Sequence, residues 1–145
     1  MRVREAMSAD VCLAHPETSI REAARMMGEH DIGALPVADG DRLVGMITDR
    51  DIALRAIAEG QGPDCRVADV MTHEVMYCFD DEETDVVAQN MGDIQVRRLP
   101  VLNRDKRLVG ILAMGDLARC EDVMQTGSAM AGISRPGGAH NQAVH

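Results

Sequence analysis

Aromatic residues are almost absent from this chain, whose 145 residues include one Tyr, one Phe and no Trp. The core must therefore come from aliphatic side chains and from eleven methionines, whose flexible thioethers fill irregular gaps. Hydrophobic residues make up 46% of the chain, but no run approaches the about 20 apolar residues that cross a bilayer. The opening MRVREAMSAD carries charges where a secretion signal needs an apolar run. We therefore expect a cytoplasmic protein that contacts no membrane.

Cysteine is also sparse, and neither cysteine nor histidine has the spacing of a metal site. The cysteines lie far apart, without a C-x-x-C pair, at Cys12, Cys65, Cys78 and Cys120. Such a set is too thin for a disulfide framework and is typical of thiols in a reducing compartment. No nucleophile is paired with a base in the pattern, so no metal, required cofactor or catalytic residue is predicted. An enzyme is the least favoured class of function.

Positive charge is in short supply, with 15 Lys and Arg against 24 Asp and Glu, for a net charge of −9. A chain this acidic repels a phosphate backbone, which argues against nucleic-acid binding. Any phosphate that the protein binds must meet a local cluster of basic groups.

An internal repeat is the strongest feature that the sequence does have. A shift of 64 positions places Met7 on Met71 and aligns two Leu-Pro-Val motifs. After one extra residue near 104–106 the shift becomes 65, and Asp51 falls on Asp116. Agreement in this order indicates a tandem duplication, so both halves should share one fold.

The first copy predicts a mixed set of strands and helices. Apolar positions with helical spacing begin at Ile20, and Ser19 with Glu22 is a capping box typical of a helix start. Two apolar runs separated by Asp-Gly-Asp predict a hairpin. The expected elements are a strand at 11–13, a helix from Ile20, strands at 34–38 and 43–47, and a helix at 49–59.

The second copy predicts the same order, so the fold class is α/β with two β-α-β-β-α repeats. Its expected elements are a strand at 75–77, a helix with the stripe Thr84, Val87, Ala88 and Met91, strands at 98–102 and 108–112, and a helix at about 114–121. One such unit leaves an apolar sheet face uncovered, and a second copy would bury it. We expect the two repeats to be related by a pseudo-twofold axis.

Glycine and proline divide the chain. We predict repeat 1 at residues 1–60, a linker at 61–66, repeat 2 at 67–121 and a C-terminal tail at 122–145. The tail is rich in Gly, Ala and Ser from Gly127 onward, so we expect part of it to be mobile and disordered.

Two long phrases carry a family resemblance. HDIGALPVADGDRLVGMITDRDIA and IQVRRLPVLNRDKRLVGILAMGDLA resemble the second halves of two CBS domains. The whole chain is similar to small stand-alone bacterial CBS-pair proteins, some of them linked to stress or hypoxia responses. Similar pairs occur in IMP dehydrogenase and in the gamma subunit of AMP-activated kinase. The resemblance implies no dehydrogenase activity, because no barrel accompanies the pair.

The family's ribose-and-phosphate motif is a glycine, two residues, Thr or Ser, two residues and Asp. Residues 45–51, GMITDRD, match it in full. A helix beginning at Thr48 would offer free backbone N–H groups and a dipole that favours an anion. Asp51, one turn in, can accept both hydroxyls of a ribose. The alternative is a plain capping box, in which the two side chains stabilise the helix and bind nothing.

The second copy departs from the motif, since GILAMGD at 110–116 has Ala113 in place of the hydroxyl residue. This change removes a phosphate contact and a helix cap. Asp116 keeps the ability to hold a ribose. The copies should therefore differ in affinity.

The resemblance also implies that each cleft combines the motif of one repeat with the strands of the other. The complete motif would then meet Arg97 and Arg98, whose guanidiniums can clamp a phosphate, although the alternative is a solvated edge that pairs with carboxylates. The predicted strong site is Thr48, Arg50, Asp51, Arg97 and Arg98, with Val75 and Met76 against the base. The predicted weaker site is Asp116, Val11, Cys12, Gly33 and Ala34.

These features favour a regulatory module that senses AMP, ADP, ATP or NAD between the two repeats. The resemblance implies that two such pairs associate as a homodimer. The alternative is a structural dimerisation or protein-interaction module with vestigial clefts, acting through an unidentified protein effector.

Overall fold

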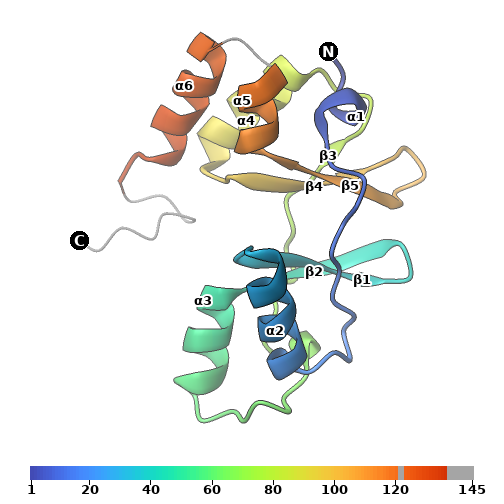
Figure 1. Ribbon diagram of the computed structural model, residues 1–145, viewed down its shortest axis with the longest axis vertical. Helices are drawn as coiled ribbons and strands as arrows, with labels where there is room; N and C mark the ends of the chain where they lie inside the picture. The colour runs from blue at the N-terminus through green and yellow to red at the C-terminus, as the bar shows by residue number, and fades with distance from the viewer. Residues whose placement is uncertain (121–122, 137–145) are drawn as a thin grey trace. The chain divides into compact units, whose positions relative to one another are not determined.

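The computed structural model describes residues 1–120 and 123–136, and the chain divides into two compact units. Unit 1 combines Met1–Val11 with the described residues from Met76 onward, and unit 2 is Cys12–Val75. In Figure 1 the N-terminal segment accordingly lies with the elements of the second repeat. The compact units thus differ from the sequence repeats, because each repeat packs with the segment that precedes the other.

Unit 2 contains the first repeat. Its elements are α2 (Ile20–His30), β1 (Ala34–Asp39), β2 (Arg42–Thr48), α3 (Asp49–Asp51), the π-helical η1 (Ile52–Ile57) and the 3-10 turn η2 (Val67–Asp69). β1 and β2 pair antiparallel, with a bulge between Val37 and Ala38, as the predicted hairpin requires. The core lies between this hairpin and α2, where Ile20, Leu35 and Ile47 are almost fully buried.

Unit 1 contains the second repeat and two further helices. Its elements are α1 (Val3–Ala6), β3 (Cys78–Phe79), α4 (Thr84–Ile94), β4 (Arg98–Leu102), β5 (Leu108–Ala113), α5 (Met114–Cys120) and α6 (Val123–Ile133). β4 is central in a three-stranded sheet, parallel to β3 and antiparallel to β5. Met91, Leu112 and Leu117 are fully buried in its core.

The first strand of each repeat starts later than the sequence predicts. The strands predicted at 11–13 and 75–77 are wrong, because these residues span the two points where the chain passes between units. Pairing begins at Ala14, which forms a single bridge to Val37, and at Cys78, the first residue of β3. Ala14 and Cys78 are equivalent in the repeat, so the same shift occurs twice.

The first helix of each repeat begins and ends as its sequence dictates. Ser19 Oγ accepts a hydrogen bond of 3.1 Å from the backbone N–H of Glu22, which confirms the predicted cap. At the other end, Asp31 and its counterpart Gln95 adopt left-handed backbone angles, with φ of 52° and 60°. A left-handed residue redirects the chain out of the helix, so both helices stop at equivalent positions.

The second helix of the first repeat is confirmed as a helix over 49–57, but most of it is π-helical. The N–H of Ala58 bonds to the carbonyl of Ala53, and that of Gln61 to Ala56, at 2.9 and 2.8 Å. Each of these bonds skips one more residue than an α-helical bond does. The widened turn has no counterpart in α5, so the two repeats differ here in local geometry.

Helix α6 corrects the prediction of a tail that is mobile from Gly127. Residues 123–133 are helical and pack on α4, and the remainder of that tail from 137 lies outside the described residues. The small residues form the contact: a Cβ added to Gly132 would lie 2.6 Å from the carbonyl oxygen of Gly92. The Gly and Ala content therefore permits close helix packing, whereas the sequence interpretation took it for mobility.

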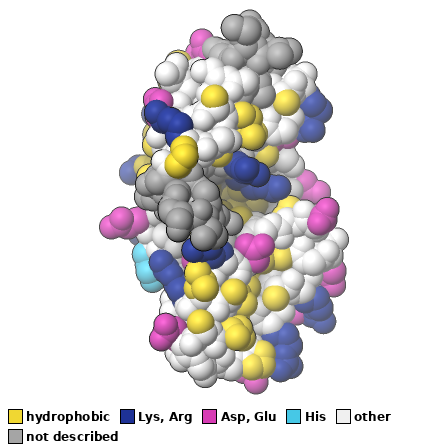
Figure 2. Space-filling view, turned by 90° about the vertical axis from the view of Figure 1, so that its left-hand side faces the viewer, with side chains coloured by type: hydrophobic (Ala, Val, Ile, Leu, Met, Phe, Trp, Pro, Cys, Tyr) yellow, Lys and Arg dark blue, Asp and Glu magenta, His cyan; other side chains and the backbone are white. Residues whose placement is uncertain are grey.

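Among the described residues, no helix has the length and apolar character needed to span a bilayer. The surface of unit 2 does carry exposed hydrophobic side chains on η1, where Leu54 and Ile57 have exposed fractions of 47% and 60%. Figure 2, which faces the side that bears α3, shows hydrophobic groups gathered among charged ones on this unit.

Candidate functional site

The motif at 45–51 occupies the end of β2 and the start of α3, within unit 2. Its glycine is needed for packing, because a Cβ at Gly45 would lie 2.5 Å from Met71 Sδ and 2.9 Å from the carbonyl oxygen of Thr72. The segment that makes this contact bridges to β2 through Met46, with reciprocal backbone bonds of 3.0 and 2.8 Å. The first residue of the motif therefore leaves room for the segment at Met71 and Thr72, which precedes the strands of the second repeat.

Unit 1 repeats this arrangement at Gly110. A Cβ there would lie 2.5 Å from Met7 Sδ and 2.8 Å from the carbonyl oxygen of Ser8. Met7 and Met71 are the equivalent residues from which the duplication was recognised. The contact is therefore a feature of the fold of each unit, and it explains both glycines without a ligand.

Thr48 and Asp51 form the predicted capping box. Thr48 Oγ1 accepts from the backbone N–H of Asp51 at 3.0 Å, and Asp51 Oδ2 accepts from the N–H of Thr48 at 3.0 Å. Asp51 Oδ1 lies 3.7 Å from Nε of Arg55, and 14% of the Asp51 side chain is exposed. A carboxylate held this way keeps lone pairs and one loosely held oxygen for further hydrogen bonds.

The corresponding site in unit 1 has half of this cap. Asp116 Oδ2 accepts from the N–H of Ala113 at 2.9 Å, but Ala113 has no hydroxyl to return the bond. Asp116 Oδ1 bonds to the guanidinium of Arg119, and 13% of the Asp116 side chain is exposed. Asp51 and Asp116 are therefore equally shielded, while Asp116 is more tightly held by its own helix.

The remaining residues of the predicted strong site are divided between the units. Arg50 is exposed on α3 in unit 2, and its backbone N–H bonds to Asp49 Oδ1 at 2.8 Å. Arg97 and Arg98 are exposed in unit 1, where the carbonyl of Arg97 accepts from the N–H of Met114 at 3.0 Å. Within its own unit, Arg97 thus lies at the start of α5. Its approach to Thr48 stays a prediction.

The residues predicted to contact the base mark the boundary between the units. Val11 is the last residue of the first segment of unit 1 and Cys12 is the first of unit 2. Val75 ends unit 2, and Met76, which is 45% exposed, resumes unit 1. The fold brings each pair to a crossing between units, and their contact with a ligand also stays a prediction.

One residue beside the weaker site was missed by the sequence interpretation. Gly33 and Ala34 lie at the start of β1, and the carbonyl of Gly33 accepts from the N–H of Asp49 at 3.0 Å. A Cβ at Gly33 would lie 3.1 Å from Asp49 Oδ2, so a carboxylate borders this neutral strand. Unit 1 has Met114 at the equivalent position. The acidic residue was visible in the motif, but only the fold brings it to Gly33.

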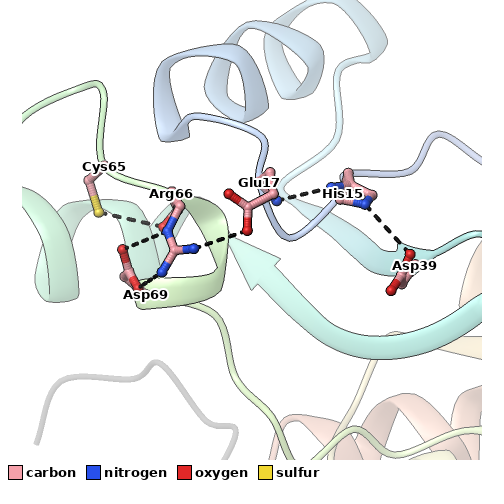
Figure 3. Close-up of polar contacts among 6 residues, drawn as sticks. All are labelled: His15, Glu17, Asp39, Cys65, Arg66 and Asp69. Carbon is pink, nitrogen blue, oxygen red and sulfur yellow. Dashed lines mark hydrogen bonds and ion pairs between the residues drawn. The ribbon is translucent and has the colours of Figure 1, made fainter.

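A separate polar cluster in unit 2 fixes the predicted linker in place (Figure 3). Arg66 bonds to Glu17 and Asp69 at 3.0 Å each, and the carbonyl of Cys65 accepts from the N–H of Ile20 at 2.9 Å. The ion-pairing side chains are about half exposed, so each pair adds little stability. The cluster positions the linker along the start of α2.

Two further kinds of site are relevant among the described residues: a metal cluster and the buried thiol of Cys78. No group of three or more His, Cys, Asp or Glu is placed to hold a metal ion in the part of the chain that the structure describes. Burial raises the pKa of the Cys78 thiol to about 12, with a further contribution from Glu82 and Asp80. A thiol with a raised pKa stays protonated at neutral pH and is a poor nucleophile.

Comparison with known proteins identifies the repeat. The model of the CBS domain matches the chain twice, over residues 3–57 and 67–122. The chain belongs to the CBS-domain family. It is 39% identical over 133 residues to the CBS domain-containing protein YhcV of Bacillus subtilis strain 168, spanning 91% of this chain and 94% of that protein. It is 41% identical over 118 residues to hypoxic response protein 1 of Mycobacterium tuberculosis, spanning 80% and 82%.

Solved structures of CBS pairs share the fold. Hypoxic response protein I, solved with two coordinated zinc ions, superposes with a TM-score of 0.76 at 36% identity, covering 84% of this chain and 100% of that one. The CBS pair of protein MJ0100, solved with 5′-methylthioadenosine and S-adenosyl-L-methionine, has a TM-score of 0.71 at 34% identity, covering 82% and 98%. Tandem CBS domains and the α/β fold class are thereby confirmed.

Proposed function

We propose that this CBS pair is a regulatory sensor of adenosine-containing ligands, with AMP, ADP and ATP foremost and NAD as a further candidate. The observation that carries the proposal is Asp51, a shielded carboxylate at a helix start within a complete G-x-x-T-x-x-D motif. The MJ0100 pair, at 34% identity, was solved with two adenosine-containing ligands. The protein would bind and signal rather than catalyse, and it would act in the cytoplasm.

The proposed strong site joins Thr48, Asp51 and Arg50 with the arginines Arg97 and Arg98. Thr48 and the first N–H groups of α3 would hold a phosphate, and Asp51 would hold the ribose hydroxyls. The arginines would neutralise the phosphates, with Val75 and Met76 against the base. The weaker site, around Asp116, lacks the hydroxyl and has the carboxylate of Asp49 beside Gly33. Repulsion between that carboxylate and a phosphate would lower its affinity further.

A panel of ligands tests the proposal. Thermal shift with AMP, ADP, ATP, NAD, 5′-methylthioadenosine and S-adenosyl-L-methionine should show stabilisation by at least one of them. A ligand at about 100 times its dissociation constant adds about 2.7 kcal/mol to the free energy of unfolding. The 2′-deoxy form of the ligand should bind more weakly, because it cannot offer a diol to Asp51.

Calorimetry on two matched variants separates the sites. Asp51→Asn and Asp116→Asn keep an oxygen that can accept the capping N–H, so the helices stay intact while the charge is lost. We expect Asp51→Asn to weaken binding about tenfold or more, since a hydrogen bond to a charged group contributes about 1.5–3 kcal/mol. Asp116→Asn should have a smaller effect. Equal losses from both variants would contradict a single strong site.

The second candidate is a structural or protein-interaction module with vestigial clefts. Two features of unit 1 favour this candidate. The motif is incomplete at Ala113, and Asp116 is already bonded to the guanidinium of Arg119. If no ligand of the panel shifts the unfolding temperature, this candidate becomes the better account of the whole chain. In either case we expect the protein to act through a protein effector and to associate as a homodimer.

A further inference from the structure

One arginine of unit 2 lies between the carboxylate of the motif and a part of the chain that is distant in sequence. Arg55 is in η1, and its Nε lies 3.7 Å from Asp51 Oδ1. Its Nη1 donates a hydrogen bond of 3.3 Å to the carbonyl oxygen of Met71. Because unit 2 ends at Val75, the guanidinium connects the candidate site to the segment by which the chain leaves this unit.

The segment at Met71 and Thr72 rests on the strand that carries the motif. Thr72 exchanges backbone hydrogen bonds of 2.8 and 3.0 Å with Met46, and a Cβ added to Gly45 would meet the side chain of Met71. The backbone bonds use the N–H and the carbonyl of Thr72, and the carbonyl of Met71 accepts from Arg55. The arginine is therefore an additional attachment of this segment.

The two oxygens of Asp51 have different roles. Oδ2 accepts from the N–H of Thr48 at 3.0 Å and belongs to the helix cap. Oδ1 faces Arg55 at a distance longer than a hydrogen bond, so charge rather than a directed bond holds the two together. A ribose hydroxyl of the proposed ligand would donate to this same oxygen. Ligand and arginine would then share one partner.

Unit 1 holds the equivalent carboxylate from another position. Asp116 Oδ1 bonds to Arg119, three residues further along α5. Asp51 instead meets Arg55, four residues further along its helix. With the shift of 65 that aligns the two helices, the counterpart of Arg55 is Cys120, which carries no cationic group. The bridging arginine is thus a feature of unit 2, the unit with the complete motif.

We propose that Arg55 is a positioning residue that couples the charge of Asp51 to the segment at Met71 and Thr72. The inference rests on the proposed function and adds its regulation, because a ligand at Asp51 would alter how firmly the chain is held near its exit from unit 2. Such a coupling is reciprocal, so a change at Met71 would alter ligand affinity by the same factor. Since Arg55 is about half exposed, the coupling should be small.

Hydrogen exchange of the full chain without ligand tests the coupling. The Thr72 N–H, which is bonded to Met46, should exchange faster than the slowest amides of unit 2, which report global unfolding. Asp51→Asn and Arg55→Gln should each speed Thr72 exchange about two- to fivefold, because the guanidinium bridge loses one of its anchors or is removed. The double variant should exchange no faster than Arg55→Gln alone, because Asp51 acts through Arg55.

Arg119→Gln is the matched control. It removes the equivalent arginine–carboxylate pair of unit 1 and should leave the Thr72 rate unchanged. Four results would each overturn the proposal: additive effects in the double variant, a wild-type Thr72 rate in Arg55→Gln, an equal acceleration in Arg119→Gln, or Thr72 exchange as slow as that of the slowest amides.

Adding AMP to the same proteins keeps the coupling and the sensor function distinguishable. AMP should change Thr72 exchange more in wild type than in Arg55→Gln, and an equal change in both would overturn the regulatory role of Arg55. If AMP does not bind while the ligand-free effects are non-additive, the sensor function fails for AMP and the role of Arg55 stands. If AMP binds but those effects are additive, the role of Arg55 fails and the sensor function stands.

Discussion

Equivalent residues of the two repeats differ in solvent exposure next to α6, which only unit 1 contains. Met114 and Leu117 of unit 1 are 7% and 0% exposed, whereas Asp49 of unit 2 is exposed and Ile52 half-buried. The hairpins beneath them pair in the same register, with a bulge at the same place. The unit with the additional helix therefore has a different set of core residues, although the two hairpins keep the same register.

A second difference concerns the helix starts. Thr48 and Asp51 exchange two hydrogen bonds, while Ala113 and Asp116 make one. The carboxylate cap is present at both helix starts, and the missing hydroxyl removes one capping hydrogen bond from the second. The repeats thus differ in the number of hydrogen bonds that cap equivalent helix starts.

The largest expected change in the free energy of unfolding comes from truncating a core residue that α6 helps to bury. Leu117→Ala should lower the free energy of unfolding by about 2–5 kcal/mol, because it leaves a cavity in a closed core. Ile52→Ala at the equivalent, half-buried position should cost about 1–2 kcal/mol, because water already reaches part of that side chain. Urea unfolding followed by circular dichroism measures both. Similar losses would mean that α6 does not close the core of unit 1.

The sequence predicted the parts of the fold that depend on local pattern. Both hairpins, the Ser19 cap and the second helix of each repeat follow from apolar spacing and from turn and cap residues. The starts of the first strands were missed because they depend on where the chain crosses between units. The residue types at 11–13 and 75–77 give no signal that the chain passes between units at these points.

The candidate site was predictable to a smaller extent. The capping box of Thr48 and Asp51 follows from spacing alone, and so does its weakening at Ala113. The role of Gly45 does not, because it depends on Met71, which is distant in sequence and close only after folding. The helix α6 was missed for a related reason, since small residues that pack a helix closely resemble those of a mobile tail.

A gain of stability should follow from making the second helix start like the first. Ala113→Thr supplies the hydroxyl that can accept from the N–H of Asp116, as Thr48 does for Asp51. Completing an N-cap adds about 0.5–2 kcal/mol to the free energy of unfolding. Ala113→Val has nearly the same shape without the hydroxyl and serves as the control. An equal gain in Ala113→Val would assign the effect to packing rather than to the cap.

The smallest expected effect is a pH dependence of stability. Unit 1 has the titratable thiol of Cys78 at a position where unit 2 has Ala14, which does not titrate. Burial raises the pKa of Cys78 to about 12 from an ordinary value of 9.0. The folded state therefore keeps this proton at pH values where the unfolded chain has released it. The resulting stability is fully present below pH 9 and is lost as the pH rises toward 12, by about 1 kcal/mol at pH 10.

Replacing the thiol by its counterpart isolates this contribution. Cys78→Ala lowers stability at every pH through the lost volume, but it should remove the part of the pH dependence that Cys78 supplies. Urea unfolding of wild type and Cys78→Ala at pH 8, 9 and 10 measures the difference between their slopes. The groups that titrate in both proteins cancel in that comparison. Parallel stability profiles would show that the thiolate is tolerated in the folded state, and that Cys78 is then more accessible to water than its burial on β3 implies.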